Sequence, residues 1–186
     1  MRITGGTLGG RIINVPKKGV RPTQERVREA VFSSLAGGIE GARVLDLFAG
    51  SGALGLEAWS RGAGHVCWVE QDACTFQMLK ANVRTLCGAE AADHCMRADV
   101  MVYLRRCRNT YDFILADPPY EGHTLNFDTY QFLESIATQG CLKLEGCLIL
   151  EQRASQAVSE HPSWVIAKSK SYGDTRVLYY ALNPEP

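Results

Sequence analysis

The chain has 186 residues, of which 46% are hydrophobic and 22% charged, the length and composition of one globular domain. No run reaches the roughly 18 apolar residues that a membrane-spanning helix needs, and no apolar stretch follows the first residues. We therefore expect neither a membrane span nor a secretory signal, and we predict a cytoplasmic protein.

The charges are unevenly distributed although they sum to zero. Residues 1–28 contain seven Lys or Arg and one acidic residue, a net charge of +6, so the rest of the chain carries −6. A basic segment on an acidic body indicates a polyanionic partner such as a nucleic acid. A solvated terminal tail explains the same charges equally well.

The cysteines are odd in number, and none forms a C-x-x-C pair. Most lie within apolar runs, so we expect buried, reduced thiols rather than a disulfide framework. Because no cluster of closely spaced metal ligands accompanies them, we expect no metal site. The seven are Cys67, Cys74, Cys87, Cys95, Cys107, Cys141 and Cys147.

Residues 1–22 predict a small basic hairpin, or arm, with β-like pieces at 1–4 and 11–15 on either side of a glycine-rich turn. A helix follows with Thr23 as its N-cap, an apolar stripe at helical spacing, and Gly37-Gly38 as its stop. We expect a second unit over residues 23–186.

From residue 42 onward, short apolar strands alternate with helical stretches, which predicts an α/β fold with a mostly parallel sheet and helices on both faces. The last two strands alternate across a Tyr-Gly-Asp turn and predict an antiparallel C-terminal hairpin. Asp72 is placed to cap the helix that follows the second strand. The predicted strands are 43–48, 65–70, 94–98, 111–116, 146–152, 164–171 and 175–182, and further helices are predicted at 53–59, 100–107 and 127–138.

A glycine-rich turn, Phe48-Ala49-Gly50-Ser51-Gly52, joins the first strand to its helix, and Gly55 follows within that helix. Glycines let the backbone approach a ligand closely, and the helix start presents free N–H groups. A lone G-x-G is common by chance, so a plain tight turn is the alternative.

Three acidic residues favour a ligand at this turn. Glu70 ends the second strand twenty residues after Gly50, where ribose hydroxyls need a carboxylate. Asp99 follows the third strand and either accepts from an adenine amino group or only caps helix 100–107. Asp46 precedes the turn and would repel a pyrophosphate, which favours S-adenosylmethionine, with its ammonium and sulfonium, over NAD.

A second motif, Asp117-Pro118-Pro119-Tyr120, lies at the end of the fourth strand. The prolines stiffen the turn and remove backbone donors. The Asp117 carboxylate and the Pro118 carbonyl are placed to accept both N–H groups of an amine on a base, while Tyr120 offers a face for stacking. The alternative is a proline-terminated loop with an acidic cap.

These motifs together resemble the bacterial 16S ribosomal RNA guanine-N2 methyltransferases, members of the class I S-adenosylmethionine-dependent group. The D-P-P-Y motif alone also occurs in DNA adenine methylases, whereas the N-terminal R-P-T segment is more specific, and Trp59 stands where leucine is expected. The matching stretches are Arg2–Gly6 with Gly10-Arg11, Arg21–Phe32, Leu45–Ala58, Ser60–Ala63 and Asp117–Tyr120.

The resemblance implies a Rossmann-like methyltransferase domain over 23–186, S-adenosyl-L-methionine as donor, and a guanine of 16S rRNA in an assembled or partly assembled small subunit as acceptor. It assigns catalysis to Asp117, Pro118, Pro119 and Tyr120. It assigns the cofactor to Asp46, Phe48, Ala49, Gly50, Ser51, Gly52, Gly55, Glu70, Asp99 and Val100. The RNA contacts are expected at Arg2, Arg11, Lys17, Lys18, Arg21, Thr23 and Arg26.

Two other functions compete with this reading. One is a DNA adenine-N6 or cytosine-N4 methylase, although 186 residues leave little room for a target-recognition insertion. The other is a non-catalytic RNA-binding factor of ribosome assembly, against which the intact glycine turn and Asp-Pro-Pro-Tyr motif argue. If the chain is an enzyme, Asp117 is too weak a base to deprotonate an aryl amine, so we expect it to orient the amine and stabilise its developing charge.

Overall fold

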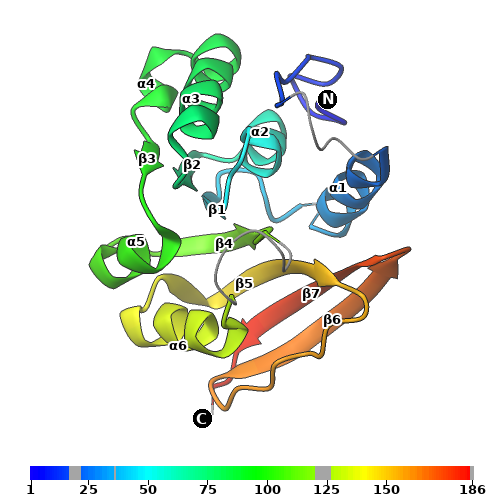
Figure 1. Cartoon of the computed structure of the whole chain (residues 1–186), viewed down its shortest axis with the longest axis vertical. Coiled ribbons are helices and arrows are strands. Elements are labelled where there is room, and N and C mark those ends of the chain that lie inside the picture. Colours follow the sequence, from blue (N-terminus) through cyan, green and yellow to red (C-terminus); the bar gives the residue numbers. More distant parts are fainter. Residues whose placement is uncertain (17–21, 36, 120–126, 185–186) are drawn as a thin grey trace.

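The computed structural model describes residues 1–16, 22–35, 37–119 and 127–184, and these form one seven-stranded sheet (Figure 1). The strand order is β3-β2-β1-β4-β5-β7-β6; β1 to β5 run parallel, and β7 and β6 are antiparallel to their neighbours. The predicted α/β architecture is thereby confirmed. The strands are β1 (Arg43–Leu47), β2 (His65–Glu70), β3 (Cys95–Arg97), β4 (Tyr111–Ala116), β5 (Leu142–Arg153), β6 (Trp164–Tyr172) and β7 (Thr175–Leu182).

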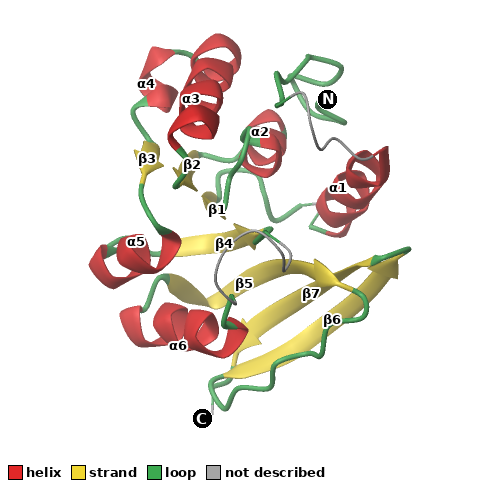
Figure 2. Cartoon of the chain, viewed as in Figure 1, coloured by secondary structure: helices red, strands yellow, loops and turns green. Residues whose placement is uncertain are grey.

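Helices cover both faces of the sheet, as Figure 2 shows. Alternate side chains along each central strand face opposite ways, so Val44 joins one hydrophobic core and Leu45 the other. One face packs against α1 (Pro22–Ser34), α2 (Ala53–Ser60), α3 (Ala73–Cys87) and the short α4 (Ala89–Ala92). The other packs against α5 (Val100–Arg106) and α6 (Thr129–Gln139).

Several boundaries differ from the prediction. Helix α1 begins at Pro22, so Thr23 lies inside the helix and is not its cap; proline suits the first helical position because its missing N–H is unpaired there anyway. Helix α6 begins at Thr129 because the Asp128 side chain accepts from the Gln131 N–H. Strand β5 begins at Leu142, four residues early, and α4 was not predicted.

The seven cysteines are free thiols, as predicted, and four of them are buried; Cys74 is the exposed one. Asp72 caps α3 as predicted, accepting from the Thr75 N–H at 2.8 Å. In the part of the chain that the structure describes, no helix is long and apolar enough to cross a membrane.

The first sixteen residues form a minimal hairpin packed onto the body of the protein. A single antiparallel bridge joins Arg2 to Ile12, and the side chains of Ile3 and Ile13 are 2% and 1% exposed within the core under α1, α2 and α3. A solvated tail is therefore wrong for this segment. The proposed boundary between an arm at 1–22 and a domain at 23–186 stays a prediction, and residues 17–21 lie outside the described part.

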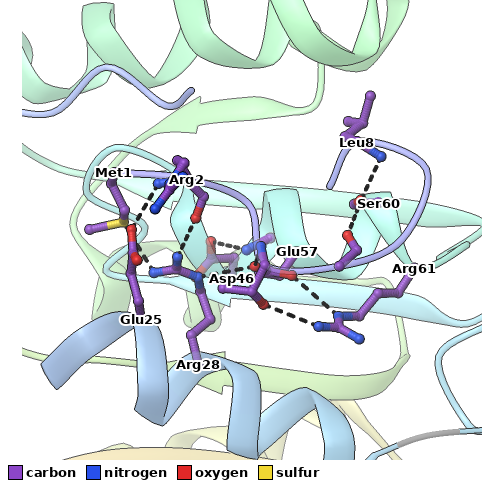
Figure 3. A network of polar contacts seen from close by, with 12 residues as sticks. Met1, Arg2, Leu8, Glu25, Arg28, Asp46, Glu57, Ser60 and Arg61 are labelled. Atoms are coloured by element: carbon purple, nitrogen blue, oxygen red, sulfur yellow. Dashed lines mark hydrogen bonds and ion pairs between the residues drawn. The ribbon is translucent and has the colours of Figure 1, made fainter. Parts of the chain in front are cut away.

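A buried ion network holds this hairpin to two helices (Figure 3). Glu57 on α2 is fully buried and accepts from Arg28 of α1 at 3.3 Å, from Arg61 at 3.2 Å and from the Thr4 backbone N–H. Arg28, 3% exposed, also donates to the Arg2 carbonyl at 2.5 Å. The Glu57 carboxylate thus joins three segments that are distant in sequence.

Glu57→Ala is expected to destabilise the protein by about 3–5 kcal/mol, because it leaves the buried Arg28 guanidinium without its counter-charge and the Thr4 N–H without an acceptor. Urea unfolding measures the loss. The matched control Glu29→Ala removes an exposed glutamate from α1 and should change the free energy of unfolding by no more than about 0.5 kcal/mol. Equal effects of the two substitutions would contradict the assigned role of Glu57.

Candidate active site

In the glycine-rich turn after β1, every second residue from Phe48 to Gly52 has a left-handed backbone conformation. Phe48, Gly50 and Gly52 have φ of 59°, 56° and 90°. For phenylalanine this conformation is strained, and such strain concentrates at functional sites. The turn is held by the Ala49 N–H donating to the Val69 carbonyl at 3.0 Å, and the Phe48 ring packs edge-on against Phe127.

Asp46 is buried directly beneath this turn, with 1% of its surface exposed. Its Oδ2 accepts from the Gly55 N–H at 2.8 Å, whereas its Oδ1 has no hydrogen-bond partner among the described residues. Burial raises the pKa of Asp46 to about 7, and the charge of Glu70 adds to the rise. A half-satisfied buried carboxylate of this kind fits a cationic hydrogen-bond donor.

Two cavities adjoin at the C-terminal edge of the sheet and share Phe48, Gly50 and Asp117. The smaller has a volume of about 170 Å³ and the larger about 680 Å³. This edge, where the strand order reverses, is where open α/β sheets bind ligands. The smaller cavity is also lined by Asp46, Ala49, Ser51, Arg28 and Glu151, and the larger by Glu70, Asp72, Arg97, Val100 and Pro119.

Glu70 joins the end of β2 to the glycine turn. Its Oε2 accepts from the Gly50 N–H and its Oε1 from the Asp72 N–H, both at 2.8 Å. A carboxylate oxygen has two lone-pair sites, so each retains acceptor capacity toward the larger cavity. That arrangement fits a vicinal diol such as a ribose.

Three of the predicted cofactor residues do not line either cavity. Asp99 is exposed and caps α5, accepting from the Val102 N–H at 2.9 Å, while its neighbour Val100 lines the larger cavity. The adenine contact of Asp99 stays a prediction. Gly52 and Gly55 serve packing, because a Cβ at Gly55 would lie 2.0 Å from the Trp68 indole nitrogen and one at Gly52 2.7 Å from Leu79.

Asp117 follows β4 and borders both cavities. Burial and the nearby charges of Glu151 and Asp46 raise its pKa well above the ordinary value. Such a shift at a cavity is typical of functional carboxylates. Pro118 is buried and Pro119 lines the larger cavity, whereas Tyr120 lies outside the described residues.

Sequence reasoning missed two charged residues of the smaller cavity, Arg28 and Glu151. Arg28 was counted with the basic arm, but it is buried against Glu57 and forms part of the cavity wall. Glu151 was read only as part of a strand. The available signal was an acidic residue at the end of an apolar run, the same signal that drew attention to Glu70 and Asp117.

The expected RNA contacts divide into two groups. Arg2 and Arg11 on the hairpin and Arg26 on α1 are exposed. Lys17, Lys18, Arg21 and the side chain of Thr23 lie outside the described part of the structure. These assignments stay predictions.

The sheet order, the strained glycine turn and the acidic cavities define a Rossmann-like methyltransferase of class I, the S-adenosylmethionine-dependent group. Residues 1–181 match the family model described as Conserved hypothetical protein 95. The chain belongs to this family, and the resemblance to small-subunit ribosomal RNA methyltransferases is confirmed.

Named relatives cover nearly the whole chain. The ribosomal RNA small subunit methyltransferase D of Escherichia coli K12 is 35% identical over 97% of this chain and 89% of its own length. The putative rRNA methyltransferase YlbH of Bacillus subtilis is 32% identical over 97% and 98%. Among solved structures, the putative methyltransferase yhhF from Escherichia coli superposes with a TM-score of 0.84 at 32% identity, covering 100% of this chain and 99% of that one.

Asp46→Asn is expected to flatten the dependence of stability on pH. Because folding raises the pKa of Asp46 from 3.8 to about 7, the stability that its protonated form contributes is complete below about pH 4 and is lost as the pH rises through about 7. Asparagine does not titrate, and its amide oxygen still accepts from Gly55.

Urea unfolding at pH 5 and pH 8 measures this difference. From pH 5 to pH 8, the free energy of unfolding of the wild type should fall by on the order of 2 kcal/mol more than that of Asp46→Asn. The control Asp93→Asn, at an exposed position, should behave as the wild type does. A wild-type pH profile in the Asp46 variant would rule out titration of Asp46 near neutrality.

Proposed function

We propose that this protein transfers a methyl group from S-adenosylmethionine to the exocyclic N2 of a guanine in 16S ribosomal RNA. The observation that carries the proposal is the placement of Asp117 and Pro119 on the cavities that the glycine turn and Asp46 also line. The names of the relatives, small-subunit rRNA methyltransferase D and putative rRNA methyltransferase, support an rRNA substrate.

The residues of the two cavities fit the cofactor. Glu70 would accept from the ribose hydroxyls, Val100 and Phe48 would contact the adenosine, and the open Oδ1 of Asp46 would accept from the ammonium of the methionyl part. When bound, the cofactor supplies a methyl group already activated by a positive sulfonium. The protein therefore has mainly to align the acceptor and to exclude other reactions.

Asp117 and Pro118 would orient the acceptor amine. The carboxylate accepts one N–H and the Pro118 carbonyl the other, which aims the nitrogen lone pair and favours the positive charge that develops on nitrogen. The raised pKa of Asp117 disfavours its ionised form. A positive group bound in the adjoining cavity would lower this pKa again and so favour the ionised carboxylate, which accepts hydrogen bonds.

The RNA is held by the basic side chains of the arm and α1. Arg2, Arg11, Lys17, Lys18, Arg21, Thr23 and Arg26 would contact phosphates or sugars, which position the RNA without reading its sequence. The base itself would leave its stack to enter the smaller cavity. We propose an assembled or partly assembled small subunit as the substrate.

Tritium transfer from labelled S-adenosylmethionine to small subunits, free rRNA and duplex DNA tests the proposal. Label in small subunits, recovered as N2-methylguanine after digestion, is the expected result. Label in duplex DNA would instead favour a DNA methylase. Binding to subunits without transfer to any substrate would favour the non-catalytic assembly factor.

Asp117→Ala is expected to abolish most methyl transfer while leaving cofactor affinity nearly unchanged. Asp117→Asn should retain more activity, because its amide oxygen still accepts, but it loses the charge that favours a developing cation, an effect of about 2–4 kcal/mol. Single-turnover methylation of undermethylated small subunits measures the rate, and calorimetry measures cofactor affinity. Asp174→Asn, at an exposed residue between β6 and β7, is the control. Full activity of Asp117→Ala would show that Asp117 is not part of the catalytic site.

Replacing Arg2, Arg11 and Arg26 by glutamine is expected to weaken binding of small subunits without changing cofactor affinity. If each side chain neutralises one phosphate, the slope of log affinity against log salt concentration flattens by about two to three units. The matched control replaces Arg105, Arg106 and Arg108, exposed residues at the end of α5 on the other side of the sheet. Equal slopes for the two triple variants would show that Arg2, Arg11 and Arg26 do not contact RNA phosphates.

A further inference from the structure

A second basic segment lies at one edge of the sheet. Residues 164–182, which span β6 and β7, contain three Lys or Arg and one acidic residue, a net charge of +2, whereas the chain after residue 28 sums to −6. Lys168 and Lys170 lie on β6, and neither forms an ion pair with a described residue. Their charges differ in this respect from that of Lys143, which pairs with Asp112 at 2.7 Å.

Both lysines lie on the face of the sheet that also carries the arm and α1. The Lys168 ammonium lies 5.1 Å from the centre of the Tyr179 ring, and Tyr179 belongs to the core on that face. The Tyr179 hydroxyl is hydrogen-bonded to that of Ser34 on α1 at 2.8 Å. Lys170 pairs with Val177 of the same core. Because directly paired residues point to one face of a sheet, Lys170 shares this face with Lys168.

The register of the sheet places Lys170 in line with Asp117. The pairing of β4 with β5 ends at Ala116 and Leu150, one residue before the row that leads to Lys170. That row consists of Asp117 after β4, Glu151 of β5, Val177 of β7 and Lys170 of β6. Neighbouring strands lie about 4.8 Å apart, so three spacings put the Lys170 backbone about 14 Å from that of Asp117.

The direction of β6 brings the lysines toward the edge at which the cavities open. Strand β7 is antiparallel to both β5 and β6, so β6 runs in the same direction as β4 and β5 (Figure 1). Lys170 is two residues from the C-terminal end of β6. The arm lies on the other side of β4, where Glu57 of α2 and Asn82 of α3 hold it. The site thus has the arm on one side and the β6 lysines on the other.

The lining of the cavities explains why a nucleic acid needs cations at this edge. The carboxylates of Asp46, Glu70 and Asp117 line the cavities, and the Arg28 guanidinium is ion-paired with Glu57. RNA carries a negative charge on each phosphate, so a strand that approaches this edge gains affinity chiefly from cations beside the cavities. Phosphate contacts of this kind position the RNA without reading its sequence.

We propose that Lys168 and Lys170 form a second phosphate-binding strip, which holds the RNA next to the target nucleotide on the side of the site away from the arm. The assignment rests on the proposed function and adds a contact surface that the basic N-terminal segment does not include. With cations on both sides of the carboxylates, the RNA would cross the mouth of the site. Contacts on both sides restrict the orientation in which the target nucleotide reaches Asp117.

A different role would also place lysines on β6. This strand is the edge of the sheet, and lysine on an edge strand opposes pairing with a second copy of the chain. Edge protection does not need both lysines on the face of α1, whereas the proposed RNA contact does. Ser169 and Ser171 alternate with the lysines and are exposed on the opposite face. The chain therefore offers a matched control for the face on which the cations lie.

The test exchanges lysine and serine along β6, through Lys168→Ser, Ser169→Lys, Lys170→Ser and Ser171→Lys together. This exchange variant keeps the composition, net charge and edge lysines of the wild type, but its cations point away from α1. A second variant, Lys168→Gln with Lys170→Gln, removes the cations. Affinity for small ribosomal subunits is measured over a range of salt concentrations. Calorimetry with S-adenosylmethionine and urea unfolding check that cofactor binding and the fold are intact.

Both variants should flatten the slope of log affinity against log salt concentration by about one to two units, the effect of losing two phosphate contacts. They should also raise KM for subunits and leave kcat nearly unchanged, because phosphate contacts stabilise the ground state and the transition state alike. A wild-type slope in the exchange variant would overturn the assignment. So would a glutamine variant that self-associates in sedimentation while its monomer binds subunits with the wild-type slope, since the lysines would then only protect the edge.

The two levels of the proposal fail differently. Unchanged slopes in both variants, with small subunits still methylated by the wild type, would overturn the role of the lysines and leave the proposed function intact. Flattened slopes without methyl transfer by the wild type would overturn the proposed methylation and keep the lysines as RNA contacts. A wild type that neither binds nor methylates small subunits would overturn both.

Discussion

The reversal of strand order between β1 and β4 is the constraint on which the site depends. From β1 the sheet grows outward through β2 and β3, and from β4 it grows the other way through β5. The helices that follow β1 and β4 lie on opposite faces, so the chain diverges between the carboxyl ends of these two neighbouring strands. Asp46, the glycine turn and Asp117 all lie at or near that edge.

The electrostatics of this edge follow from what surrounds it. Arg28 lies at the smaller cavity, where its guanidinium is ion-paired with Glu57. Burial raises the pKa of both Asp46 and Asp117; the charge of Glu70 adds to the rise at Asp46, and the charges of Glu151 and Asp46 add to it at Asp117. Surroundings of this kind disfavour ionised carboxylates, and a positive ligand reverses that preference. Binding of such a ligand to the folded state alone also stabilises the protein by mass action.

The sequence predicted those parts of the site whose signals are local. The glycine turn, Asp46 before it, Glu70 at a strand end and the Asp-Pro-Pro step each occupy a few consecutive residues, and the alternation of strands and helices placed them at one edge. The start of β5 was hidden because polar Lys143 and Glu145 interrupt its apolar pattern and a bulge shifts its pairing with β4. Which strand lies next to β4 is likewise not encoded locally, so the pairing of Asp117 with Glu151 required the structure.

The attachment of the arm is the clearest case of information that no local pattern carries. Glu57 binds Thr4, 53 residues away, and Asn82 of α3 exchanges hydrogen bonds with the Asn14 backbone, 68 residues away. The same Asn82 amide donates to the Ser51 carbonyl in the glycine turn at 3.0 Å.

These contacts make the arm and the turn parts of one packed body. Thr4 is tied to α2, the helix that the glycine turn begins, and Asn14 is tied through Asn82 to the turn itself. Ser60, at the other end of α2, accepts from the Leu8 N–H and donates to the Gly5 carbonyl. A displacement of the hairpin therefore strains the same side chains that hold the turn in its left-handed conformation. The proposed RNA-binding side chains of the hairpin and the proposed cofactor site at the turn therefore belong to one rigid unit, which fixes the distance between the two sites.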